Sequence, residues 1–241
     1  MSETFFISDT HINHANSIIH GKRPYLLEGD LNEKGKWISE EVKQARTDEM
    51  NRDIVRIWNG IVGPKDLIYI CGDFCWRDHR KWLNELHGKK VLIIGNHDRM
   101  PQDALDLFLG NVEWNKLGYE ESVKSMLKTM TNFREVHQLL DRKICGQRMT
   151  LCHYPMNTWS SSIHGSWEIC GHSHGRHRDS RPGEADGGLI LDVGWDIWHK
   201  PLSFEEVKAE MRIKFNKMPQ NFKDHVMKGM PLSRDEEDLE D

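Results

Sequence analysis

The sequence lacks any apolar run approaching the ~18 residues that a membrane-spanning helix needs. Its first residues, Met1 to Phe6, also lack the basic segment and the following apolar segment of a secretory signal. Cysteine is scarce: there are five cysteines, an odd number, and no two of them form a C-x-x-C pair. We therefore expect a cytoplasmic protein with reduced cysteines and no membrane segment.

A large excess of charge of either sign is also missing from most of the chain. The formal net charge is −5, and Asp235–Asp241 holds six of the acidic residues, so the remaining chain has a net charge of +1. Proteins that hold nucleic acid usually have a basic excess, so no stable nucleic-acid complex is expected. A small phosphorylated substrate, such as a nucleotide, remains compatible with this charge.

The sequence contains an alternation of short aliphatic segments and helical segments, which predicts an α/β fold. With 241 residues, of which 37% are hydrophobic, the chain can bury one large core. The predicted strands are Thr4–Ile7, Leu67–Cys71, Lys90–Ile94, Met149–Cys152, Trp167–Cys170 and Leu189–Val193.

Helix signals lie between these strands and after them. We expect helices over 78–87, from Thr47 to Gly60, from Pro101 to Gly110, and after Ser203, where Ser-Phe-Glu-Glu forms a capping box. The interpretation is one domain over residues 1–216, with insertions at about 13–46 and 113–132. Beyond Lys217 the periodicity fades, so residues 217–241 are expected to form a tail that is acidic at its end.

Five of the six predicted strands are followed by side chains that can bind a metal ion. These side chains are Asp9, His11, Asp73, Asn96, His153, His172 and His174. The functional crevice of an α/β sheet lies beyond the carboxyl ends of its strands, so we expect these side chains to meet. Oxygen and nitrogen donors suit Mn, Fe, Zn, Co or Ni, and seven ligands are too many for one zinc ion. The sequence therefore predicts a hydrolase with two metal ions that share one carboxylate.

The order of these residues also resembles the signature of the calcineurin-like metallophosphoesterases. The matching blocks are Asp9-Thr10-His11, Gly72-Asp73, Gly95-Asn96-His97-Asp98, His153 and Gly171-His172-Ser173-His174. The resemblance covers about residues 3–210, and details such as Arg23-Pro24-Tyr25 look like the small phage and bacterial branch of the family. It implies a four-layer α/β/β/α sandwich and two divalent transition-metal ions, with manganese the first choice.

The resemblance also implies a role for each matching residue. It places Asp9, His11, Asp73 and His174 on one ion, and Asp73, Asn96, His153 and His172 on the other, so that Asp73 would bridge them. His97 matches the histidine on the leaving-group side of the phosphate, and Asp98 matches the residue that orients this histidine. The implied reaction is in-line attack on phosphorus by a metal-activated water.

The substrate is less constrained by the sequence. Gly72-Asp73-Phe74-Cys75-Trp76-Arg77 places Trp76 where relatives of the protein phosphatases have a second aspartate. With a nearly neutral body and no dense arginine cluster outside 176–181, we expect a small phosphodiester or nucleotide-like substrate. The alternatives are a phosphomonoesterase or phosphoprotein phosphatase, and a non-catalytic scaffold, which would typically have lost ligands. The candidate substrate-binding residues are His14, Arg23, Arg77, Arg99 and Arg176.

Overall fold

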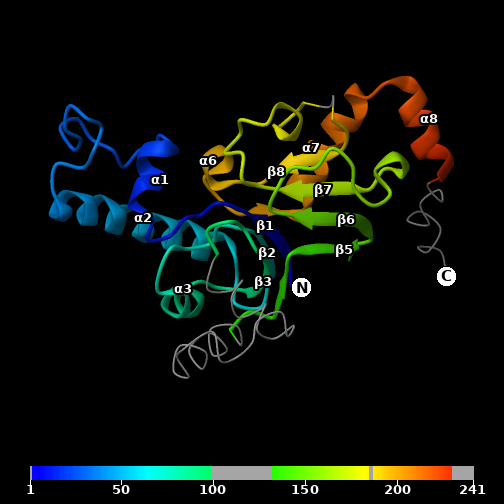
Figure 1. The fold of residues 1–241 in the computed structure, drawn as a ribbon. Coiled ribbons are helices and arrows are strands. Elements are labelled where there is room, and N and C mark those ends of the chain that lie inside the picture. Colours follow the sequence, from blue (N-terminus) through cyan, green and yellow to red (C-terminus); the bar gives the residue numbers. More distant parts are fainter. Residues whose placement is uncertain (1, 99–131, 185–186, 230–241) are drawn as a thin grey trace, which may run out of the picture.

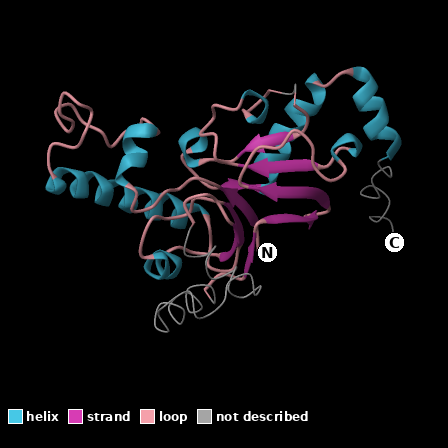
Figure 2. Cartoon of the chain, viewed as in Figure 1, coloured by secondary structure: helices cyan, strands magenta, loops and turns pink. Residues whose placement is uncertain are grey.

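The structure, a computed structural model, describes residues 2–98, 132–184 and 187–229. Two β-sheets face each other, and helices lie on their outer sides (Figures 1 and 2). This arrangement is the α/β sandwich that the sequence predicted.

The first sheet has five strands in the order β4-β3-β2-β1-β9. β1, β2, β3 and β4 run parallel, and β9 pairs with β1 in the antiparallel direction. The strands are β1 (Thr4–Ile7), β2 (Leu67–Cys71), β3 (Lys89–Ile93), β4 (Glu135–His137) and β9 (Leu202–Ser203).

The second sheet has four strands in the order β5-β6-β7-β8. β5 and β6 form an antiparallel hairpin, whereas β6, β7 and β8 run parallel. The strands are β5 (Leu139–Ile144), β6 (Gln147–Cys152), β7 (Trp167–Cys170) and β8 (Ile190–Asp192).

Helices connect and cover the strands. The α-helices are α1 (Ala15–His20), α2 (Glu40–Ile61), α3 (His79–Glu85), α6 (Trp195–Trp198), α7 (Phe204–Lys217) and α8 (Gln220–Gly229). Two 3₁₀ turns are η2 (Ser162–His164) and η3 (Arg178–Ser180). None of the helices in the described ranges is both long and apolar enough to cross a membrane.

The core has two parts because side chains alternate along each strand. Phe5 and Ile7 of β1 belong to a buried cluster that includes Trp58 of α2. Phe6 points to the other face and belongs to the cluster between the sheets, with Leu151 of β6. Burial of each such side chain contributes roughly 1.5–3 kcal/mol to stability, so both faces of β1 hold the layers together.

The main strands and the capping box of α7 agree with the prediction. Ser203 Oγ accepts from the backbone N of Glu206, and the Glu206 side chain accepts from the backbone N of Ser203. The predicted start of α2 at Thr47 was wrong, because Ser39 caps the helix by accepting from the backbone N of Val42 at 3.2 Å. Acidic residues follow this cap in the first turn, as the helix dipole favours.

Within the predicted tail after Lys217, α8 occupies Gln220–Gly229. β4, β5 and β9 were not predicted, since each is short or strongly polar. The predicted helix over 101–110, nearly all of the 113–132 insertion and the acidic end of the chain lie outside the described residues.

Backbone pairing between the residues that follow β1 and β8 brings the two sheets together at one edge, here called the β1–β8 junction. The backbone N of Ser8 donates to the carbonyl of Val193 at 3.1 Å, and the backbone N of Trp195 donates to the carbonyl of Ser8 at 2.8 Å. Because this junction lies at the carboxyl ends of both strands, the loops that follow the strands of both sheets meet there.

Candidate metal centre

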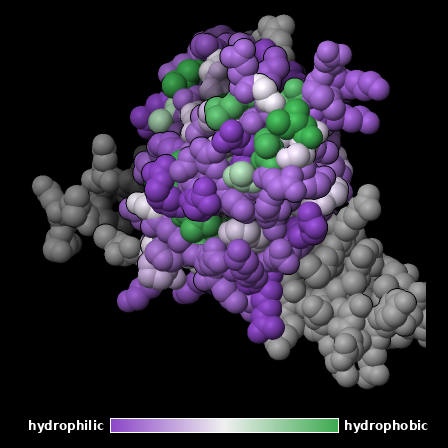
Figure 3. All heavy atoms as spheres, turned by 90° about the vertical axis from the view of Figure 1, so that its left-hand side faces the viewer, coloured by the Kyte–Doolittle hydropathy of each residue, from purple (hydrophilic) through white to green (hydrophobic). Residues whose placement is uncertain are grey.

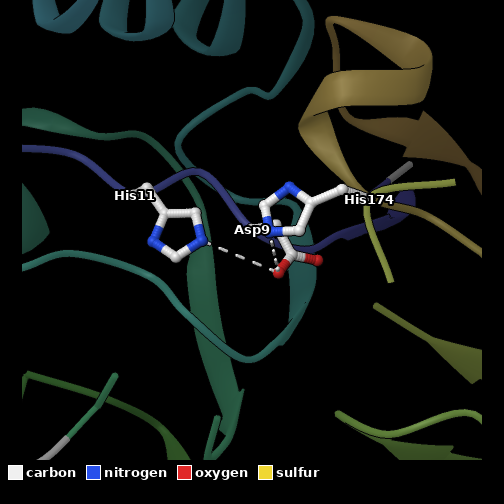
Figure 4. A group of neighbouring side chains, drawn as sticks. All are labelled: Asp9, His11 and His174. Atoms are coloured by element: carbon white, nitrogen blue, oxygen red, sulfur yellow. Dashed lines mark ion pairs between the residues drawn. The ribbon is translucent and has the colours of Figure 1, made fainter. Parts of the chain in front are cut away.

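One carboxylate and two imidazoles, from Asp9, His11 and His174, form a first group of possible metal ligands where the two sheets meet (Figure 4). Oδ1 of Asp9 lies 3.9 Å from Nε2 of His11 and 3.7 Å from Nε2 of His174. Within the described part of the chain, this buried oxygen has no hydrogen-bond partner. An unpaired buried carboxylate oxygen is costly, so the geometry favours a cation between these groups.

The separations themselves fit shared coordination. They are too long for hydrogen bonds. Two donor atoms bound to one tetrahedral ion at about 2.1 Å lie about 3.4 Å apart, close to the distances around Asp9. The oxygen and nitrogen donors also match a divalent transition metal. These residues therefore fit a divalent transition-metal ion of the kind that the sequence predicted.

Asp73 lies between the first group of donors and a second one. Its Oδ2 is 3.5 Å from Nε2 of His11 and 3.6 Å from Nε2 of His153. Asn96 continues the second group, since its Oδ1 lies 3.0 Å from Nε2 of His153 and 2.9 Å from Nδ1 of His172. The structure thus brings all seven predicted ligands together, with Asp73 at the centre.

The pKa values of the first group depend on burial. Burial raises the pKa of Asp9 to about 8, and the charges of Asp192 and Asp73 add to the rise. Burial and the charge of Arg23 move the pKa of His11 well below its usual value, which keeps the imidazole neutral. Neutral imidazole is the form that binds metals, and a cation would offset the cost of ionising Asp9.

Backbone conformation concentrates strain at these positions. Five predicted ligands have a positive φ, which is uncommon for residues other than glycine. They are Asp9 (54°), His11 (49°), Asp73 (53°), His172 (66°) and His174 (48°). Such conformations persist only where the surrounding structure holds them, and they gather at functional sites. Hydrogen bonds between the loops supply this support: the backbone N of His11, for example, donates to the carbonyl of Asp73 at 3.0 Å.

Two glycines make the close approach of these loops possible. A Cβ on Gly171 would lie 1.8 Å from Oγ of Ser8 and 2.4 Å from Oδ2 of Asp9. A Cβ on Gly72, whose φ is +88°, would lie 2.2 Å from Nδ1 of His153. Only glycine fits at these strand ends because any side chain would displace a ligand.

Asp196 is the functional residue that the sequence reasoning missed most clearly. Its Oδ2 pairs with Nδ1 of His174, and its Oδ1 accepts from Nε of Arg23 at 2.7 Å. Burial lowers the pKa of His174, but the hydrogen bond to Asp196 and the charges of Asp9 and Asp196 outweigh it, so the net shift is upward. A carboxylate on the far nitrogen of a ligating histidine fixes its orientation and tautomer.

Arg23 lies behind the site and is buried. Its guanidinium donates to the carbonyls of Asp9 and Thr10 at 2.7 and 2.8 Å, in addition to Asp196. We predicted it as a substrate-binding candidate, but the structure places it where it holds the Asp9 loop. The Arg23 side chain has no surface exposed to solvent, so a substrate that enters from solvent would not contact it.

Other supporting contacts involve residues that were not singled out. Ser8 Oγ donates to Oδ2 of Asp9 at 2.6 Å, and Nδ1 of His153 lies 2.9 Å from the carbonyl of Cys71. Asp192 is buried and accepts from Oγ of Ser173 at 2.6 Å. The available signal was that Asp192 lies near the carboxyl end of the sixth predicted strand, Leu189–Val193, and the candidate ligands follow the other five strands.

His97 and Asp98 follow β3 and have different surroundings. The His97 side chain is 35% exposed, and its Nε2 lies 4.0 Å from Oδ2 of Asp73. Asp98 is buried and accepts from the backbone N of Asp73, Phe74 and Gly95 at 2.7–2.9 Å. Burial and the charge of Asp73 raise the pKa of Asp98 to about 7. Asp98 therefore holds the loops around Asp73, and its carboxylate faces backbone rather than the His97 ring.

The remaining substrate candidates occupy different places. Nδ1 of His14 lies 3.3 Å from Nδ1 of His11, within hydrogen-bond distance, and burial lowers the pKa of His14 to about 4, which favours its neutral form. Arg77 is exposed beside His14. Arg176 is exposed and donates to the carbonyl of His20 at 3.1 Å. Arg99 lies outside the described residues.

Comparisons with known proteins extend over most of the chain. An uncharacterized protein of Methanocaldococcus jannaschii is 26% identical over 85% of this chain and 89% of its own length. The Gene 66 protein of Mycobacterium phage D29 is 26% identical over 86% of this chain and 95% of its own length. A crystal structure of a protein of unknown function from Aquifex aeolicus is 21% identical with a TM-score of 0.49, and covers 87% of this chain and 99% of that one.

The family model for the calcineurin-like phosphoesterases matches residues 4–219, a range that includes every ligand named above. The chain therefore belongs to the calcineurin-like phosphoesterase family, whose members bind divalent metal ions and hydrolyse phosphoesters.

Proposed function

We propose that this protein hydrolyses small phosphodiesters, including nucleotide-like ones, at the centre formed by the seven metal-ligand candidates. The observation that carries the proposal is the position of Asp73, whose Oδ2 lies within 3.6 Å of imidazole nitrogens from both groups of donors. One carboxylate between two donor groups supports a site for two ions. A complete ligand set also favours an enzyme over a scaffold.

The chain's residues divide into two metal sites. Asp9, His11, His174 and Asp73 would hold one divalent transition-metal ion, and Asp73, Asn96, His153 and His172 the other. When bound, such ions polarise a phosphoryl oxygen and lower the pKa of water toward neutrality. Manganese is our first choice, with iron, zinc, nickel or cobalt as alternatives, because carboxylate, amide and imidazole donors suit all of them.

His97 is the group we place on the leaving-group side. Its side chain is partly exposed, and its backbone N is fixed by donation to Oδ1 of Asp73 at 2.8 Å. In hydrolysis, water forms a new bond to phosphorus while the ester oxygen departs. A proton donated by His97 would neutralise that departing oxygen.

The arginines near the site support a diester more than a monoester. Arg23 is committed to Asp9, Thr10 and Asp196, and Arg176 donates to the carbonyl of His20. A phosphomonoester dianion favours a dense arginine clamp, whereas a singly charged diester needs less added positive charge. The nearly neutral charge of the chain before its acidic end argues against a stable complex with long nucleic acids.

The test compares the substrates with one another on each metal-loaded preparation. Purified protein is loaded separately with Mn, Zn, Co, Ni or Fe(II), and kcat/KM is measured for bis-p-nitrophenyl phosphate, cyclic nucleotides, p-nitrophenyl phosphate and a phosphopeptide. We expect the diesters to have the higher kcat/KM. A higher value for p-nitrophenyl phosphate with the same metal would favour a phosphomonoesterase, and turnover of the phosphopeptide alone would favour a phosphoprotein phosphatase.

A further inference from the structure

A row of aromatic rings leads away from the metal-ligand candidates. The rings of His174 and His11 are stacked with centroids 5.3 Å apart, and the His14 ring lies 5.2 Å beyond His11. Trp76 ends the row, stacked on His14 at 4.3 Å with an angle of 12° between the planes. The row therefore extends from the metal-ligand candidates His174 and His11 to the indole of Trp76.

Trp76 is held firmly although much of it is exposed. Its backbone N donates to the carbonyl of Ile12 at 2.8 Å, next to a parallel bridge between Ile12 and Cys75. His14 covers one face of the indole, and the residue is still 41% exposed. A large aromatic side chain on a fixed backbone, with the rest of its surface open, is a suitable stacking platform.

A hollow of about 160 Å³ adjoins this platform, and His14, Lys43, Trp76 and Arg77 are among its lining residues. Within the described residues, the Arg77 guanidinium has no hydrogen bond or ion pair, whereas Lys43 pairs with Glu40 at 3.0 Å. The hollow is smaller than the ~300–1,000 Å³ of sites for drug-sized ligands, so it suits one planar ring system.

The surrounding surface does not suggest a protein-docking face. Figure 3 views the side of the molecule that carries α1 and α2, where hydrophilic residues dominate and hydrophobic ones occur in small groups. Extended protein interfaces have an apolar centre, and a single aromatic ring beside a free arginine lacks one. The features at Trp76 therefore fit a small ligand.

The position of Trp76 relates it to one side of the phosphate. Its ring centroid lies 5.4 Å from that of His97, and the His14 centroid is equally far from His97. His97 in turn has its Nε2 4.0 Å from Oδ2 of Asp73. A group stacked on Trp76 would thus belong to the half of the substrate that leaves past His97.

We propose that Trp76 and Arg77 form a nucleobase subsite for the leaving half of the substrate. The inference rests on the proposed function and narrows it to phosphodiesters whose leaving oxygen is on a nucleoside. Every base has a π-face, so stacking tolerates different bases, and the larger purine face should be favoured over the pyrimidine. The Arg77 guanidinium would donate to acceptor atoms of the base or to sugar oxygens at the rim.

The test uses substrates that have the same reacting atoms and differ only in the base. They are adenosine 2′,3′-cyclic phosphate, uridine 2′,3′-cyclic phosphate and the 2′,3′-cyclic phosphate of methyl ribofuranoside, which has no base. With Mn-loaded wild-type protein, we expect kcat/KM to be about tenfold or more higher for the adenosine compound than for the base-free one. Uridine should lie between them.

Variants distinguish a loss of base stacking from a general loss of activity. Trp76→Ala should reduce the ratio of adenosine to base-free kcat/KM toward one, and Trp76→Phe should retain most of it. Tyr154→Ala is the matched control, because Tyr154 is 46% exposed and lies beside His172 on the opposite group of donors. This control should keep the ratio. Equal losses for both substrates in Trp76→Ala, or collapse of the ratio in Tyr154→Ala instead, would overturn the proposal.

A binding measurement distinguishes failure of the subsite from failure of the proposed function. If no diester is hydrolysed, the phosphodiesterase proposal fails, and titration calorimetry of Mn-loaded protein with AMP and with ribose 5-phosphate still tests the subsite. Tighter binding of AMP that is lost in Trp76→Ala supports it. Equal affinities for the two compounds in the wild type contradict it.

Discussion

Arg23 and Asp196, although 173 positions apart in sequence, form a buried ion pair of 2.7 Å behind the metal centre. Asp196 also pairs with Nδ1 of His174, and Arg23 also holds the carbonyl of Asp9. The pair therefore connects two residues that we expect to hold the same ion. It does so through Nδ1 of His174 and the carbonyl of Asp9, and leaves Nε2 of His174 and Oδ1 of Asp9 available to the ion.

This connection predicts that Asp196→Asn weakens metal binding without removing a ligand. The amide accepts less strongly from His174 and leaves Arg23 without its charge partner. Loss of a group that orients a ligating histidine typically costs 10–100-fold in metal affinity. Competition with a chromophoric chelator measures the affinity, and exposed Asp224→Asn controls for the loss of one charge. An unchanged metal affinity would show that Asp196 contributes to packing and not to metal binding.

Asp73→Asn should reduce metal content more than loss of any single non-bridging ligand. One carboxylate between two donor groups neutralises charge in both sites, while an amide supplies one good donor oxygen. We expect plasma mass spectrometry after saturation with Mn to give up to two ions per chain for the wild type. His172→Ala is the matched loss of a ligand from one site. No more than one ion in the wild type would refute the dinuclear site.

His97→Ala should keep its metals and lose turnover, most of all with poor, basic leaving groups. A general acid matters in proportion to the proton demand of the leaving oxygen, and commonly contributes about 10²–10⁴-fold. A series of phenyl diesters with graded phenol pKa measures this dependence, and activated nitrophenyl esters should be affected least. Equal losses along the series would instead assign His97 to phosphate binding.

Glu168 should make stability fall with rising pH. Its side chain is buried, and this burial raises its pKa to about 8, with one hydrogen-bonded partner, the backbone N of Met156. The folded pKa exceeds the unfolded one, so the contribution to stability is complete below about pH 4.5 and is lost as pH rises through about 8. Glu168→Gln should therefore be more stable than wild type at pH 8.5, by up to about 5 kcal/mol, and nearly equal to it at pH 4.5.

Urea unfolding at both pH values measures this difference. Glu205→Gln, on the exposed surface of α7, controls for removal of a negative charge. A gain of stability for Glu168→Gln that is the same at both pH values would show that titration of this carboxyl is not the cause.

The strands that carry the site were predictable because their signals are local. β1, β2 and β7 have the predicted bounds, since each is a short, mostly apolar buried run that is followed within two residues by a candidate ligand or a glycine. α2 was predicted to start too late because Ser39 lies in a polar stretch where many residues could cap a helix. β4 and β9 have too few residues to produce a pattern at all.

The sequence by itself determined the family, six of the strands along the chain and the types of the candidate ligand residues at their ends, because these features are read directly from the chain. Only the tertiary structure decided that Arg23 lies behind the site, that Asp196 pairs with His174, and that Trp76 stacks on His14. The partners are 14 positions apart for Arg23 and Asp9, 22 for Asp196 and His174, and 62 for Trp76 and His14. These relationships depend on loops that meet only in the folded chain, where β1 pairs with β2 and the segments after β1 and β8 pair with each other, so no local pattern could reveal them.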